Sequence, residues 1–162
     1  MDVPYEDLDA VFRLLAACFC GMLIGANRGV RGKPTGMRTL GLVSLGAALV
    51  TVVMIRIPDM AENPDALSRV LQGVIQGVLT GIGFIGAGVV IRERRGLKVH
   101  GLTTAAAVWV TAALGIACAL ASWDLVAVAI VTTLLLLILV RPVDRWLEAR
   151  NAGDDRGAAA GD

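Results

Sequence analysis

Polar side chains within long apolar runs are the groups in this sequence best placed for chemistry in a membrane. Gln72, Gln76 and Thr80 follow one another at intervals of four residues, so they would share one face of a helix. Amide and hydroxyl groups on such a face can ligate a cation or hydrogen-bond a neighbouring helix. No Asp or Glu lies in the middle of an apolar run, which disfavours a carboxylate relay for protons.

The loop at 27–39 is the second candidate for chemistry, because it combines four Lys or Arg residues with glycine and proline. Such a loop can bend closely around an anion, and a phospholipid headgroup would suit it. Our candidate contacts for an anion or headgroup are Asn27, Arg28 and Arg38. The alternative is that the basic residues only fix the orientation of the chain in the membrane.

Glycines crowd the segment GIGFIG at 81–86. The letters match the GxGxxG dinucleotide fingerprint, but that motif needs a strand before it and a soluble βαβ unit around it. Two interpretations remain: close helix packing, or a broken helix that lines a pathway. The candidate pathway or packing residues are Gln76, Gly81, Gly83, Gly86, Thr103 and Thr104.

The composition places these residues in a membrane protein. Of the 162 residues, 56% are hydrophobic and 18% charged, and the mean hydropathy is +0.72, which is outside the range of soluble domains. Five runs are long enough to cross a bilayer as helices. We predict an all-α transmembrane domain at 1–140, with helices near 10–26, 39–55, 70–91, 102–121 and 123–140. Residues 141–162 would form a short cytoplasmic tail with a disordered end.

The distribution of Lys and Arg predicts the orientation. Twelve of the fifteen fall between the first and second runs, between the third and fourth, or after the fifth. We therefore expect two same-direction helical hairpins with basic cytoplasmic loops, plus a fifth helix. The N-terminus would lie outside and the C-terminus in the cytoplasm of a bacterial inner membrane.

Enzyme and cofactor chemistry has little support in the sequence. The chain has three cysteines, all in apolar runs, and His100 is its only histidine. We expect no enzyme activity, no metal site, no cofactor and no nucleic-acid partner. The partners to expect are the lipid bilayer and either a second copy of the chain or a larger membrane complex.

The two hairpins resemble each other when the chain is shifted by sixty-five positions. Gly21 then aligns with Gly86, Gly36 with Gly101 and Thr39 with Thr104. A true repeat would relate the hairpins by an axis along the membrane normal. Chance similarity between small-residue segments is the alternative.

Three segments resemble the MgtC/SapB family of membrane proteins. GMLIG at 21–25, followed by Arg28 and by KPTGMRT at 33–39, resembles the opening signature of the family. GIGFIGAG at 81–88 resembles its glycine-rich third helix. GLTTAA at 101–106 with WVTAA at 109–113 resembles its fourth. The resemblance covers roughly residues 14–140.

The resemblance implies a bacterial inner-membrane protein of about five helices, linked in some members to survival at low magnesium. It implies either a transporter or magnesium-related homeostasis factor, or a non-transporting regulator of a larger membrane complex such as the ATP synthase. Asn27 stands where the family usually has an acidic residue, which puts an ion site there in doubt. We also expect only the N-terminal transmembrane domain, without the C-terminal cytoplasmic domain of some members.

Overall fold

The structure is a computed structural model that describes residues 5–33, 35–57, 64–92, 101–140 and 142. These residues form helices and no strand. The helices are α1 (Tyr5–Gly29), α2 (Met37–Ile55), α4 (Pro64–Arg92), α5 (Leu102–Ala119) and α6 (Trp123–Leu135), which continues as the π-helix η1 (Leu136–Val140). Within the described ranges, five segments are long and apolar enough to cross a membrane. The predicted class, an all-α membrane protein with five spans, is confirmed.

Several sequence predictions concern positions outside this description. His100 and most basic residues of the second loop lie in the segment 93–100, and the predicted tail lies at 141–162, of which only Pro142 is described. The structure therefore describes the first basic loop, at 27–39, except for residue 34, and leaves residues 93–100 of the second outside its description.

The helices begin and end at residues whose conformation suits a turn. Gly101 precedes α5 with a φ of 92°, a left-handed conformation that glycine adopts without steric cost. Ala121, in the short connection from α5 to α6, has a φ of 53°. The amide of Ser122 there donates to the carbonyl of Ala117 at 3.1 Å, which closes the end of α5. A very tight turn therefore joins the last two membrane segments.

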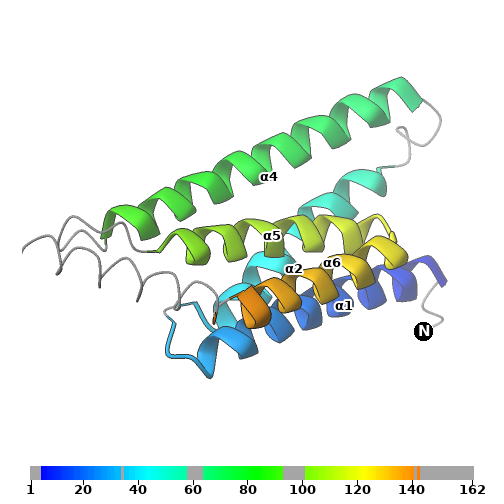
Figure 1. Cartoon of the computed structure of the whole chain (residues 1–162). Coiled ribbons are helices and arrows are strands. Elements are labelled where there is room, and N and C mark those ends of the chain that lie inside the picture. The colour runs from blue at the N-terminus through cyan, green and yellow to red at the C-terminus, as the bar shows by residue number, and fades with distance from the viewer. Residues whose placement is uncertain (1–4, 34, 58–63, 93–100, 141, 143–162) are drawn as a thin grey trace, which may run out of the picture. The chain divides into compact units, whose positions relative to one another are not determined.

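The chain divides into two compact units, Met1–Ile130 and Val131–Asp162. The first unit holds α1, α2, α4, α5 and the beginning of α6. In it, α1, α2 and α5 pack against one another, and α4 packs mainly along α5 and less along α2 (Figure 1). The second unit holds the end of α6 and η1.

The contact of α1, α2 and α5 centres on Ser44 of α2, which is fully buried. Gly21 of α1 lies against the carbonyl of Leu40 and the Cβ of Ser44, and Gly115 of α5 lies against the backbone of Ser44. A side chain at either glycine would occupy the place of these atoms. Glycine therefore lets the three backbones approach closely, as small residues do in membrane bundles.

The two hairpins of the suspected repeat make helix contacts at equivalent positions. Gly21 packs on Leu40 in the first hairpin, and Gly86 packs on Ala105 in the second, where an added Cβ would lie 3.3 Å from the Cβ of Ala105. Both members of the second pair are shifted by sixty-five positions from the first. Ala47 and Ala112, related by the same shift, are buried in one cluster. These equivalent contacts favour a structural repeat over chance similarity.

Helix α4 runs without a break through all its glycines. Its inner face packs Ile75, Val78 and Ile82 against the cluster of Ala47, Ala112 and Ile116. The GIGFIG segment is therefore continuous helix, and the broken-helix interpretation does not describe this structure. The remaining faces of α4 are largely exposed.

Candidate functional site

Arg28, in the last turn of α1, is only 4% exposed. Its Nε donates to the Thr35 hydroxyl at 2.9 Å and its Nη2 to the Thr104 hydroxyl at 2.6 Å. A longer contact of 3.5 Å joins Nη1 to the carbonyl oxygen of Thr103. We call Arg28, Thr35 and Thr104 the arginine clasp. It joins the end of α1, the first basic loop and the beginning of α5.

The positive charge of Arg28 in the clasp is stabilised by the dipole of α1. Arg28 lies in the last turn of α1, where the helix dipole favours a cation. Two ion pairs between described residues lie elsewhere, one between Arg13 and Asp9 at 2.6 Å and one between Arg56 and Asp7 at 2.9 Å. Arg28 is held by neutral acceptors in the part of the chain that the structure describes, and its role there is to fasten the two hairpins together.

The three predicted anion or headgroup contacts have different environments. Arg28 is buried in the clasp, and Asn27 beside it is half-buried. Arg38 is exposed in the first turn of α2, where it borders a groove between α2 and α4. Of the three, Arg38 is therefore the side chain open to a ligand at the membrane surface.

The predicted pathway residues do not gather around one channel. Thr104 belongs to the clasp, Thr103 contributes its carbonyl there, and Gly86 is packed on Ala105. Gln76, Gly81 and Gly83 are exposed on α4. The structure thus groups Thr103 and Thr104 with Arg28, and separates them from the polar residues of α4.

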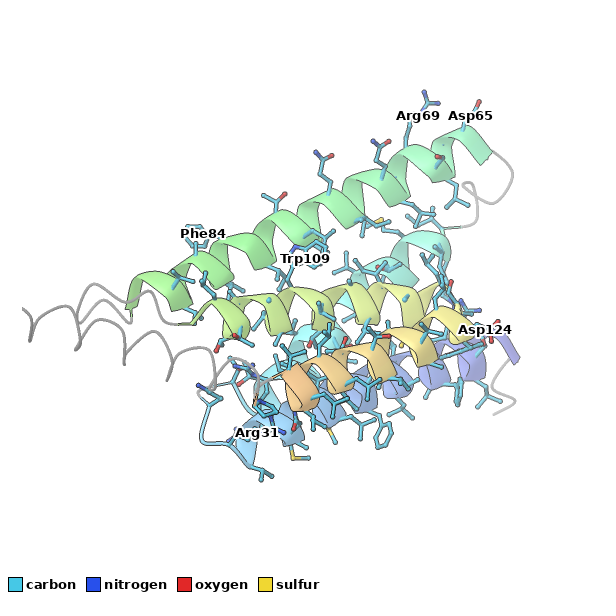
Figure 2. The ribbon with its side chains drawn as sticks, in the orientation of Figure 1. Arg31, Asp65, Arg69, Phe84, Trp109 and Asp124 are labelled. Carbon is cyan, nitrogen blue, oxygen red and sulfur yellow. The ribbon has the colours of Figure 1, made fainter. Side chains whose placement is uncertain are left out.

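The exposed side of α4 carries a regular row of polar and small residues. Its members are exposed and spaced by four, three, four, four, three and four residues: Asp65, Arg69, Gln72, Gln76, Thr80, Gly83 and Ala87. This spacing keeps them on one face of a helix. We call this row the α4 seam. Figure 2 shows Asp65 and Arg69 projecting from α4 on the side away from α5.

Sequence reasoning found only the middle of this seam. It placed Gln72, Gln76 and Thr80 on one face but did not follow the same spacing outward to the remaining members. The signal that could have found them is the alternation of three- and four-residue steps, which is typical of a helix–helix contact. That pattern does not indicate which side of α4 faces the other helices of the chain.

No three Cys, His, Asp or Glu residues lie close enough to hold a metal ion in the described part of the chain. Cys20 of α1 and Cys118 of α5 are buried, with their sulfur atoms 4.0 Å apart. This contact is a further packing point between the two helices.

Comparison with known proteins places the chain among membrane proteins of one family. A sequence model of the MgtC family matches residues 14–146. The chain is 41% identical to protein SrpB of Synechococcus elongatus over 154 residues, which cover 90% of the chain and 84% of SrpB. It is 38% identical to protein MgtC of Salmonella typhimurium, over 81% of the chain and 52% of that protein.

A third relative is protein SapB of Bacillus subtilis, 33% identical over 70% of the chain and 48% of SapB. The chain thus spans about half the length of MgtC and of SapB. No solved structure matches it. The family match covers most of the residues, including the arginine clasp and the whole of α4, so this chain belongs to the MgtC family.

Proposed function

We propose that this protein is a non-transporting regulator that binds a transmembrane helix of a larger membrane complex through the α4 seam. The observation that supports this role is the exposure of Gln72, Gln76 and Thr80 on a membrane-spanning helix. The side of α4 that its own chain covers is the apolar one.

The central residues of the seam lie in the middle of the membrane. The span Asp65–Val90 has 26 residues, or about 39 Å of helix, against a hydrocarbon core of about 30 Å. Its ends therefore reach the surface, and Gln76 and Thr80 fall near the centre. The Thr80 hydroxyl donates to the carbonyl of Gln76 at 2.7 Å within α4. The Gln76 amide stays exposed, and an amide facing hydrocarbon is costly unless a partner hydrogen-bonds it.

The chemistry of the seam fits a helix as the partner. Gly83 and Ala87 allow a close approach of backbones, and the two glutamines can donate and accept hydrogen bonds across the contact. Each such bond is worth about 0.6–2 kcal/mol in a membrane. Asp65 and Arg69 add charge at the end of the seam, where the helix can reach water.

Transport of magnesium or another ion is the competing proposal, and the same seam gives it one supporting observation. In a homo-oligomer, several α4 helices could turn Gln72, Gln76 and Thr80 toward a common axis, where they would line a polar pathway. The regulator and the transporter thus differ in what faces the seam: a helix of another protein, or the seam of a second copy.

Photo-crosslinking in native membranes separates these proposals. A photoreactive residue replaces Gln76, and a matched control replaces Leu125 of α6, which is 67% exposed. We expect a discrete product from position 76 whose mass differs from that of a homodimer, lost when Gln72→Leu is added, and no such product from position 125. A product of homodimer mass, together with magnesium flux in liposomes that Gln76→Leu abolishes, would favour transport instead.

The orientation and the location in the bacterial inner membrane are part of the proposal. In the first hairpin, Arg28, Arg31, Lys33 and Arg38 lie at one end, while Asp7, Asp9, Arg13 and Arg56 lie at the other. The excess of cations at the first end supports a cytoplasmic location for it. We expect a single cysteine at position 33 to react with an impermeant maleimide only after the inner membrane is opened. A cysteine at position 8 should react in intact spheroplasts.

A further inference from the structure

A groove of about 810 Å³ runs between α2 and α4 in the first unit of the chain. Its lining is mainly apolar: Arg38, Thr39, Leu42, Val43, Gly46, Ala47, Val50, Gly77, Val78, Gly81, Ile82 and Ile85. Glycine shapes it from both sides, because a Cβ built on Gly46, Gly77 or Gly81 would meet nothing within 4 Å. Side chains at these three positions would therefore extend into space that the groove leaves open.

The length of the groove matches one leaflet of a bilayer. Its lining on α2 extends from Arg38 to Val50, which is about 18 Å along a helix. Half of a hydrocarbon core of about 30 Å is close to this length. A bound transmembrane helix would extend across both leaflets, whereas an acyl chain ends near the centre. The dimensions thus favour a lipid chain as the occupant.

The two ends of the groove differ in polarity. Arg38 and Thr39, in the first turn of α2, border one end, and apolar residues line the remainder. Arg38 is exposed and forms no ion pair with any described carboxylate. The preceding Gly36 offers no side-chain cap, so the first amides of α2 add positive potential at the same place. An anionic group at the level of the headgroups complements this end.

From this juxtaposition we propose that the α2–α4 groove is a binding site for an anionic phospholipid. One acyl chain lies along Gly46, Gly77 and Gly81, and the phosphate lies at Arg38 and Thr39. The site uses a different side of α4 from the seam, so it does not depend on the proposed partner. A zwitterionic lipid carries an ammonium group beside its phosphate, and this group weakens its attraction to Arg38.

Native mass spectrometry of the full chain in detergent tests the site. Phosphatidylglycerol and phosphatidylcholine with identical chains are the probes. We expect one retained phosphatidylglycerol per chain and weaker binding of phosphatidylcholine. Arg38→Gln should weaken phosphatidylglycerol binding about fivefold, the equivalent of about 1 kcal/mol for one cation near a headgroup, and should weaken phosphatidylcholine binding less.

Filling the groove tests the acyl-chain half of the site. Gly81→Leu should abolish specific binding of both lipids, and Gly46→Leu fills the same groove from α2 if the first variant does not fold. The matched controls lie outside the lining: Gly73→Leu on the same helix and Arg69→Gln as an exposed cation. Neither control should change lipid binding.

Three results would overturn the proposal. The first is equal retention of the two lipids by the wild-type chain. The second is lipid binding that neither Arg38→Gln nor a folded groove-filling variant changes, which would indicate only nonspecific annular lipid. The third is a groove-filling variant that lowers the mass of an oligomer and leaves lipid retention intact, because the groove would then hold a second copy.

Discussion

Two sets of glycines in this chain look alike in sequence and differ in what surrounds them. Around Ser44, Gly21 and Gly115 lie against backbone atoms of α2. On α4, Gly73, Gly77, Gly81 and Gly83 have nothing within 4 Å of an added Cβ. The first set is required by the fold of the chain itself. The second leaves space that the chain does not fill, so its function concerns molecules outside the chain.

The largest effect should come from the first set. In Gly115→Leu the new side chain must displace the backbone of Ser44, which two helices confine, and overpacking of this kind costs about 1–3 kcal/mol or more. We expect little folded protein after extraction and a Tm lower by many degrees in detergent. Gly73→Leu, at an exposed glycine of the second set that lies outside the groove, is the control. Equal melting of the two variants would contradict the contrast between the sets.

Removal of the arginine clasp should have the next largest effect. Arg28→Met leaves the hydroxyls of Thr35 and Thr104 without their donor in a buried place, at a cost of about 1–3 kcal/mol. Arg28→Lys keeps the charge but not the planar fork that reaches several acceptors, so it should rescue only part of the stability. Thermal unfolding measures both variants. Arg38→Met, at an exposed arginine, should leave the Tm unchanged, and a similar loss there would argue against the clasp.

The sequence predicted the membrane class and the five spans well, because long apolar runs report directly on burial in lipid. It also indicated the hairpin repeat, which the pairs Gly21–Leu40 and Gly86–Ala105 support. These features depend on local composition and on a fixed shift along the chain, and both are visible in one sequence.

The sequence could not show which side of each helix faces its own chain. Arg28 and Arg38 look equivalent in the basic loop, yet one is buried and the other exposed, because only the folded hairpins bring Thr104 to Arg28. For the same reason, the sequence did not show how far the α4 seam extends beyond Gln72, Gln76 and Thr80. In a membrane protein a polar face of a helix can bond a helix of its own chain or one outside it, so the polarity of Gln72, Gln76 and Thr80 alone does not mark the inner side of α4.

The ring contact between α1 and the start of α6 should have a smaller effect. Phe12 and Trp123 meet edge to face with centroids 5.3 Å apart, a geometry worth about 0.5–1.5 kcal/mol. Phe12→Leu should lower the Tm slightly and shift the fluorescence of Trp123 in a chain where Trp109 and Trp146 are replaced by Phe. Phe19→Leu is the control, since Phe19 is nearly as exposed. An unchanged emission spectrum in the first variant would mean that the rings do not meet.

The smallest effect on stability should come from the seam, at Gly83→Leu. The new side chain meets no atom of its own chain, and leucine favours helix over glycine by about 0.5–1 kcal/mol in model helices. We therefore expect an unchanged or slightly higher Tm together with loss of the cross-linked product at position 76. These two results together would mean that Gly83 is not needed for the fold and is needed for binding. A lower Tm would show that α4 packs its seam within the chain, and intact cross-linking would show that Gly83 is outside the partner contact.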